Sequence, residues 1–253
     1  MAERRDSEQH RLAKLGILIA LALAGQFVAR WIASRYVANL GAPAQSASVA
    51  IDVILLACVP IGFLLAPRLS LPGTPLLDRW MRREYIATEF NRALFRSFVL
   101  ALISLVAALV VSMIPHALIH TEGVSAPIPL PLAISLAIAA AFREEIEFRL
   151  GLLTVLAWLI NQSSRAISAD RKSASLWTAT LIQAIAFGAL HQIAGFTGRT
   201  SALSFSGVML EPRTISGVIL GYAYIRYGLE TAIMTHALGD ASIFALVALF
   251  ARL

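Results

Sequence analysis

The sequence predicts an all-α protein, a polytopic bundle of membrane helices. Of its 253 residues 58% are hydrophobic and only 14% are charged, which is too apolar for an average soluble globular domain. The apolar residues gather into runs, and a membrane helix needs about 20 such residues. Lys and Arg outnumber Asp and Glu by 21 to 15, but the basic residues lie mainly in the loops between these runs, where they act as topology signals. We therefore expect membrane lipids as partners and no nucleic acid.

The chain divides into three parts. Residues 1–14 are a polar cytoplasmic head, residues 15–126 hold N-terminal transmembrane helices, and residues 127–253 form a C-terminal helix bundle that carries the chemistry. We expect about seven transmembrane helices, with six to eight as the range. They fall at about residues 15–32, 48–65, 98–114, 131–160, 175–190, 214–227 and 230–250.

The distribution of Lys and Arg predicts the orientation. With the N-terminus inside, 14 of these residues lie on the inner side and five on the outer side. This bias favours a cytoplasmic N-terminus in an integral membrane protein, and we expect a bacterial cytoplasmic membrane. An amphipathic helix is predicted near residues 76–95, where aromatic residues such as Trp80 and Tyr85 alternate with basic ones. Such a helix is expected to lie on the anionic inner leaflet.

Five charged residues interrupt the long apolar run of residues 128–160. They are Arg143, Glu144, Glu145, Glu147 and Arg149. An ionised side chain near the centre of a bilayer costs about 2.5 to 3.5 kcal/mol on insertion scales. Charges kept at that depth are therefore candidates for function.

Helical spacing separates these five charges. Glu145 and Arg149 are four residues apart and are expected to form an internal ion pair. Arg143 and Glu147 have the same spacing and are a second candidate pair. Glu144 is rotated by about 100° from Glu145 and has no partner at that spacing, so it is left to take and return a proton. The alternative is that all five form a buried salt-bridge cluster that fixes helix register.

Histidines recur at membrane depth in the C-terminal half. Phe187-Gly-Ala-Leu-His191 ends one apolar span, and His236-Ala-Leu-Gly-Asp240 lies inside another. His236 and Asp240 are four residues apart and project from one helix face. A single histidine in an apolar helix is more often a satisfied core residue. Two histidines, a carboxylate partner and a glutamate on a third helix instead indicate a site for chemistry.

Glu144, His191 and His236 do not all lie at the same distance from the ends of their predicted spans. Glu144 and His191 each lie 16 residues from the inner end of their spans, about 24 Å along a helix. His236 lies only six residues from the start of its span, so we expect the turn at Gly228 to stop inside the membrane. Irregular backbone at that depth is tolerated where it lines a water-filled cavity or is buried in protein.

Three motifs, in this order, resemble those of the CPBP family of intramembrane proteases. They are Glu144-Glu145-x-x-x-Arg149, Phe187-x-x-x-His191 and His236-x-x-x-Asp240. This family includes the type II CAAX prenyl endopeptidases and the Abi-like bacteriocin-processing or immunity proteins. The resemblance covers about residues 127–253. It implies an intramembrane endopeptidase whose substrate is a membrane-associated peptide or protein, with prenylated or lipid-anchored substrates as candidates.

The resemblance also implies how the matched residues act. Glu144 and His191 would activate a water molecule for peptide hydrolysis, and Glu145 with Arg149 would hold the site together.

His236 and Asp240 would support the oxyanion. Asp240 stands where Asn is commoner in the family. A protonated Asp240 could donate to the oxyanion, whereas an ionised Asp240 would orient His236. Because most relatives carry Asn, we expect the donor role.

The motifs leave the cofactor open. Family names call these enzymes metalloproteases, and zinc or another divalent metal would have Glu144, His191 and His236 as its ligands. The sequence contains no His-Glu-x-x-His signature, which would supply paired ligands from one helix. We expect no obligatory metal.

Two other classes of function fit parts of the pattern. A proton-coupled transporter could use Glu, His and Asp as a proton relay, but that class predicts interrupted spans repeated in both halves. Here the polar groups at depth gather in the C-terminal half, and the first two spans contain only Gln26 and Asp52. A non-catalytic immunity or scaffold protein of the same fold is the third alternative.

Overall fold

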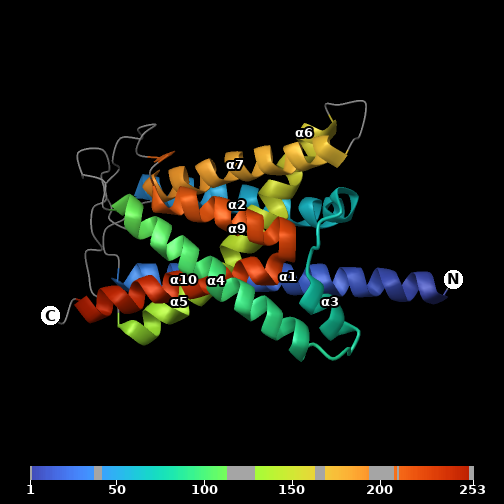
Figure 1. Ribbon diagram of the computed structural model, residues 1–253, viewed down its shortest axis with the longest axis horizontal. Coiled ribbons are helices and arrows are strands. Elements are labelled where there is room, and N and C mark those ends of the chain that lie inside the picture. Colours follow the sequence, from blue (N-terminus) through green and yellow to red (C-terminus); the bar gives the residue numbers. More distant parts are fainter. Residues whose placement is uncertain are drawn as a thin grey trace.

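The computed structural model is an all-helical bundle (Figure 1). It describes residues 2–36, 42–112, 129–162, 169–193, 208–209 and 211–250. The α-helices are α1 (Ala2–Tyr36), α2 (Ala42–Leu65), α3 (Pro75–Met81), α4 (Ala87–Ser112), α5 (Leu130–Glu144), α6 (Thr154–Gln162), α7 (Ala169–Ile193), α9 (Pro212–Tyr227) and α10 (Leu229–Phe250). A short 3₁₀-helix, η1 (Ala66–Leu69), follows α2, and a π-helix, η2 (Glu145–Leu153), joins α5 to α6. The predicted fold class is confirmed.

Five of the described helices are long and apolar enough to cross a membrane. They cover Glu8–Ile32, Val49–Leu69, Ala87–Val111, Lys172–His191 and Leu229–Leu249. Large apolar side chains on these helices point outward, and Phe27, Phe95 and Val106 are each more than half exposed. Exposed apolar surface of this extent is typical of helices that contact lipid. The chain is therefore an integral membrane protein.

Two of the seven predicted spans are not among these five. The span predicted at residues 131–160 is divided into α5, η2 and α6 and carries the five charges. The span predicted at residues 214–227 is α9, whose 16 residues are fewer than the about 20 that a full crossing needs. Helices stand at all seven predicted positions, although residues 113–114 lie outside the described part. The two segments differ from the predicted spans because α9 is short and because a π-helix interrupts residues 131–160.

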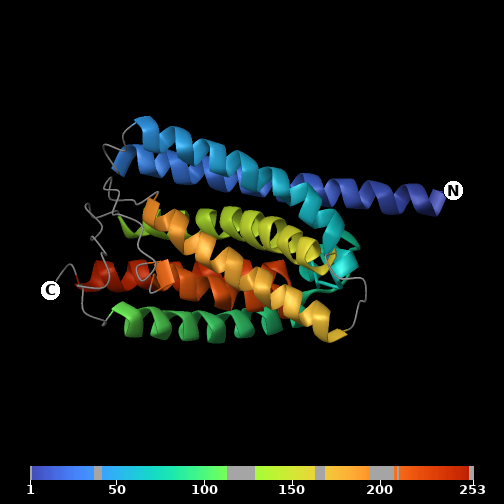
Figure 2. The same ribbon diagram turned by 90° about the horizontal axis from the view of Figure 1, so that it is seen from above.

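The C-terminal helices lie between two groups of N-terminal helices (Figure 2). On one side α1 packs against α5, and α2 packs against η2. On the other side α4 packs against α9 and α10. The helices that hold Glu144 and His236, α5 and α10, therefore pack against helices from the first half of the chain.

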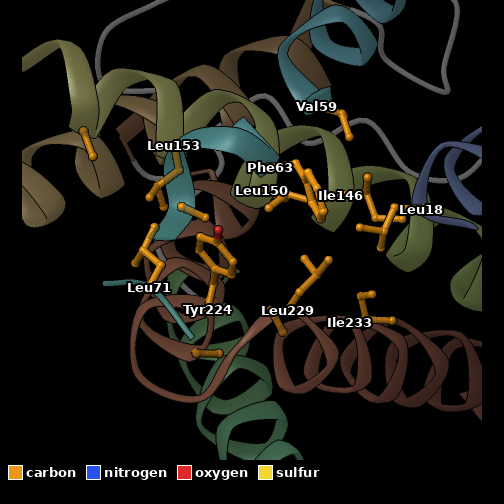
Figure 3. Packing of buried hydrophobic residues seen from close by; sticks show 14 of the residues in the cluster. Leu18, Val59, Phe63, Leu71, Ile146, Leu150, Leu153, Tyr224, Leu229 and Ile233 are labelled. Carbon is orange, nitrogen blue, oxygen red and sulfur yellow. The ribbon is translucent and has the colours of Figure 1, made fainter. Parts of the chain in front are cut away.

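The largest hydrophobic core surrounds the π-helix (Figure 3). Ile146, Leu150 and Leu153 on one face of η2 are at most 1% exposed. They pack with side chains of α1, α2, α9 and α10, among them Leu18 and Val59. This core fixes η2 in the centre of the bundle and so positions the glutamates at its start.

The structure adds detail to two predicted polar segments. The predicted head of residues 1–14 is helical from Ala2, where α1 begins and from which it runs without interruption to Tyr36. The amphipathic segment near residues 76–95 is not one helix. It contains α3, a turn, and the first residues of α4, because Arg83 has a φ of 58°. A residue in this left-handed region cannot continue a right-handed helix.

The predicted turn at Gly228 separates α9 from α10. Gly228 has a φ of 102°, and a Cβ atom there would lie 2.6 Å from Pro75 Cδ, so only glycine fits. The next amide, Leu229 N–H, donates to Gly73 O at 2.8 Å. The turn is thus fixed against the loop before α3, and it sets where α10 begins.

Candidate active site

Four polar side chains meet where α5, η2, α7 and α10 pack together. Glu144 is the last residue of α5 and Glu145 is the first of η2, while His191 lies near the end of α7 and His236 lies in α10. Glu144, Glu145 and His236 are at most 8% exposed. The structure therefore brings together residues that are far apart in the sequence, in a largely water-excluded place. π-Helical segments are frequent at functional sites, and η2 begins at Glu145, directly after Glu144.

Glu144 divides its two carboxylate oxygens between different partners. Its Oε1 accepts a hydrogen bond from Arg143 Nη2 at 2.5 Å. Its Oε2 lies 3.9 Å from His191 Nε2 and 3.9 Å from His236 Nε2. One oxygen is thus held by a cation, and the other faces two imidazole rings across a gap.

Glu145 joins η2 to α10. Its Oε1 accepts a hydrogen bond from His236 Nδ1 at 2.7 Å. Its Oε2 lies 3.0 Å from Arg149 Nε, and both side chains are fully buried. The predicted ion pair of Glu145 with Arg149 is confirmed. Glu145 thereby connects the imidazole of His236 to the buried guanidinium of Arg149.

Phe187 packs against the histidines of the site. Its side chain is 2% exposed. Its ring also packs edge-on against His191, with the centroids 4.5 Å apart, and lies 6.1 Å from the ring of His236. The Arg149 guanidinium lies 4.8 Å from the centroid of Phe187, a cation–π distance. Phe187 stands four residues before His191, about one helical turn, and this spacing is the sequence feature that indicates their contact.

The His191 ring is oriented by its own helix. Its Nδ1 lies 2.8 Å from Phe187 O, and since a carbonyl only accepts, Nδ1 carries the hydrogen in this contact. In the neutral ring the lone pair is then on Nε2, the atom that faces Glu144.

Asp240 contacts the Nε2 nitrogen of His236. Its Oδ2 lies 3.4 Å from His236 Nε2, and its side chain is 35% exposed. The ring of His236 therefore has a carboxylate near each nitrogen, Glu145 on the buried side and Asp240 on the open side. The four predicted catalytic side chains lie in one cluster.

The pairing predicted for Arg143, Glu144 and Glu147 is wrong. Glu144 was expected to have no partner, yet Arg143 binds it and forms no ion pair with Glu147. Both terminal nitrogens of the Arg143 guanidinium bind other groups, since Nη2 donates to Glu144 and Nη1 donates to Gln26 of α1. Among the described residues, Glu147 is buried without a hydrogen bond or ion pair, although Arg143 and Asp52 act on it electrostatically.

The residues expected to hold zinc do not form a metal site. Within the part of the chain that the structure describes, no three His, Cys, Asp or Glu side chains are grouped as a metal ion needs. Glu144, His191 and His236 come near one another, but the Nε2 of His236 is also contacted by Asp240. These side chains therefore do not fit a bound divalent metal ion.

Comparison with known proteins identifies the C-terminal half. Residues 126–242 match the family described as type II CAAX prenyl endopeptidase Rce1-like. No curated protein and no solved structure matches the chain. The matched range includes all three motifs, and it begins one residue before the start that the motifs suggested. Residues 126–242 are therefore a domain of the Rce1-like type II CAAX prenyl endopeptidase family, and the chain carries the domain of a protease family.

Proposed function

We propose that this protein is an intramembrane endopeptidase that hydrolyses a peptide bond of a membrane-associated substrate, with prenylated or otherwise lipid-anchored peptides as the leading class. Two findings support this function. The chain carries a CAAX endopeptidase domain, and the carboxylates and imidazoles of its motifs meet inside a membrane protein.

One observation carries the proposal. Glu144 Oε2 lies 3.9 Å from the Nε2 atoms of both His191 and His236. This separation is too long for a direct hydrogen bond, and a single water molecule can bridge polar atoms at such a distance. The attacking water would lie between these three atoms.

The water would be activated by Glu144 and His191 together. Its oxygen attacks the scissile carbonyl carbon, its proton passes to Glu144, and the lone pair on His191 Nε2 orients it. The new C–O bond gives a tetrahedral intermediate. When the C–N bond breaks, the proton held by Glu144 passes to the leaving amine, so one water molecule is consumed for each peptide bond.

His236 would support the oxyanion of the intermediate, and Asp240 would orient His236. Glu145 accepts from Nδ1 at 2.7 Å, which leaves Nε2 as the nitrogen that faces Glu144 and Asp240. A protonated Nε2 there can donate to the developing negative charge. The 3.4 Å distance from Asp240 Oδ2 to His236 Nε2 supports the orienting role, in place of the donor role that the commoner Asn suggested.

The proposal includes the location of the N-terminus in the cytoplasm, in a bacterial cytoplasmic membrane. The excess of Lys and Arg on that side supports it, and Lys14 pairs with Asp78 at 2.5 Å, which places the end of the polar head beside α3. Arg199 and Arg252, counted on the opposite side, lie outside the described residues. In a Cys58→Ser background, Gln9→Cys should react with an impermeant thiol reagent only after cells are permeabilised. Labelling of Gln9→Cys in intact cells would show that the N-terminus lies outside the cell, opposite to the proposed orientation.

The test of function uses the full chain in proteoliposomes and a panel of tagged membrane-anchored peptides, each with and without a prenyl group. The unmodified protein should cleave lipid-anchored members, and Glu144→Gln should lower kcat by about 10²- to 10⁴-fold, the usual contribution of an acid–base group. The control is Glu230→Gln, which alters another buried carboxylate whose partner is Leu77 N–H at 2.8 Å. Cleavage of no panel member, or full activity of Glu144→Gln, would overturn the proposal in favour of a transporter or a non-catalytic protein.

A further inference from the structure

Arg143 connects the Glu144 carboxylate to two helices that lie outside residues 126–242. Its Nη2 donates to Glu144 Oε1 at 2.5 Å, and its Nη1 donates to Gln26 Oε1 at 2.7 Å. Gln26 belongs to α1 and in turn donates from Nε2 to Asp52 of α2. Arg30, also on α1, donates to the same oxygen of Asp52 at 2.8 Å. A continuous chain of polar contacts thus runs from α2 through α1 to the site.

The close approach of α1 and α5 makes this chain of contacts short. A Cβ atom at Gly25 would overlap Ala139 O and would lie 3.1 Å from Arg143 Cβ. Only glycine allows the two helices to come so near. The residue after it, Gln26, is thereby placed within direct reach of the Arg143 guanidinium, whose side chain is 20% exposed.

The amide of Gln26 suits this position because it has both an acceptor and a donor. Its oxygen accepts from Arg143 and its nitrogen donates to Asp52. Asp52, an acceptor when ionised, fixes which end of the amide faces Arg143. The charge of Asp52 is balanced by Arg30. The contacts of Asp52 therefore determine how Gln26 holds Arg143.

The hydrogen bond from Arg143 to Oε1 of Glu144 determines the direction of the other carboxylate oxygen, Oε2. With Oε1 held at 2.5 Å, rotation of the carboxylate is restricted and Oε2 stays directed at His191 and His236. Catalysis depends steeply on such placement, since a misplacement of about 1 Å can cost about 10²-fold in rate.

We infer that Gln26 and Asp52 are positioning residues for Glu144, acting through Arg143, and that α1 and α2 are therefore part of the catalytic apparatus. This inference rests on the proposed catalytic use of Glu144. It assigns to the first two spans a function in the reaction, although both lie outside the family-matched residues.

The experiment measures kcat and KM of single and double variants in proteoliposomes. Gln26→Leu removes both hydrogen bonds and should lower kcat by about 10- to 100-fold, with KM changed less than about twofold. Arg143→Gln should lower kcat by a similar factor. The double variant should be no slower than Arg143→Gln alone, because Gln26 acts only through Arg143. Phe27→Leu, which alters a neighbouring side chain that is 72% exposed, is the control and should keep full activity.

A conservative pair of variants separates positioning from a general loss of structure. Asp52→Asn keeps an oxygen that accepts from Gln26 Nε2 and should retain most of the rate, whereas Asp52→Leu should resemble Gln26→Leu. Equal rates for both Asp52 variants, additive losses in the Gln26 and Arg143 double variant, or an unchanged kcat in Gln26→Leu would each overturn the inference. A fall in thermal stability that matches the fall in kcat would overturn it too.

Glu144→Gln is measured in the same series to separate two kinds of failure. If Glu144→Gln is inactive while Gln26→Leu is unchanged, the positioning inference alone is wrong. If Glu144→Gln remains active, the proposed function is wrong and the inference fails with it.

Discussion

Glu145→Gln should destabilise the protein much more than Glu144→Gln. Glu145 and Arg149 are both fully buried, with 3.0 Å between Oε2 and Nε. Loss of one partner leaves the other charge buried without compensation, which typically costs about 3 to 5 kcal/mol. Arg143, the partner of Glu144, is 20% exposed and keeps its hydrogen bond to Gln26. In Glu144→Gln, Arg143 donates to a neutral amide oxygen instead of a carboxylate, and this change should cost only about 1 kcal/mol in unfolding free energy.

Thermal unfolding of the purified variants in detergent measures this difference. For soluble domains of 150–250 residues, 1 kcal/mol corresponds to about 2 to 4 °C in Tm. On that scale Glu145→Gln should lower Tm by about 6 to 20 °C, and Glu144→Gln by about 2 to 4 °C. Glu147→Gln is the matched control. Since Glu147 is buried without an ion pair among the described residues, its neutralisation should leave Tm unchanged or raise it.

A double variant tests whether the instability comes from the unpaired charge of Arg149. Glu145→Gln combined with Arg149→Met removes both charges, and replacing a whole buried pair by apolar or neutral groups is often nearly neutral. The double variant should therefore recover a large part of the loss. Equal Tm values for Glu145→Gln and Glu144→Gln, or no recovery in the double variant, would refute the reasoning about the buried pair.

Three further predictions concern other parts of the structure. Asp240→Asn should lower kcat by about tenfold or more across the whole pH range, because the charge that orients His236 is lost; an unchanged pH–rate profile would restore the donor role. Gly228→Ala should cost about 1 to 3 kcal/mol in unfolding, because its φ of 102° is strained for any side chain, whereas Gly16→Ala, with open space around it, should not destabilise. Incubation with a chelator should leave cleavage intact, and loss of activity restored by zinc would show that a metal is required.

Much of the site was predictable because helical spacing acts at short range. The spacing of four residues put Glu145 beside Arg149 and His236 beside Asp240, and the structure has both contacts. The order of the three motifs identified the family. The positions of the helices also followed from apolar runs, since membrane spans have the simplest pattern in sequence.

The errors came from features that have no local signal. Arg143 was predicted to pair with Glu147 from their spacing, but its terminal nitrogens bind Glu144 and Gln26 of α1 instead. Gln26 and Asp52 were noticed as the polar residues of the first spans, but their partners depend on how α1 and α2 pack against α5 and η2. Contacts between helices far apart in sequence follow from tertiary packing, which spacing alone does not give.

The most direct test of the central claim is a double-mutant cycle on Glu144 and His191, measured as kcat/KM on a cleaved lipid-anchored peptide. If both side chains activate one water molecule, each alanine variant should lose nearly all activity and the double variant should be no worse than either. All variants should still be present in the membrane at normal levels. Full activity in either single variant, or losses that multiply in the double variant, would contradict the account.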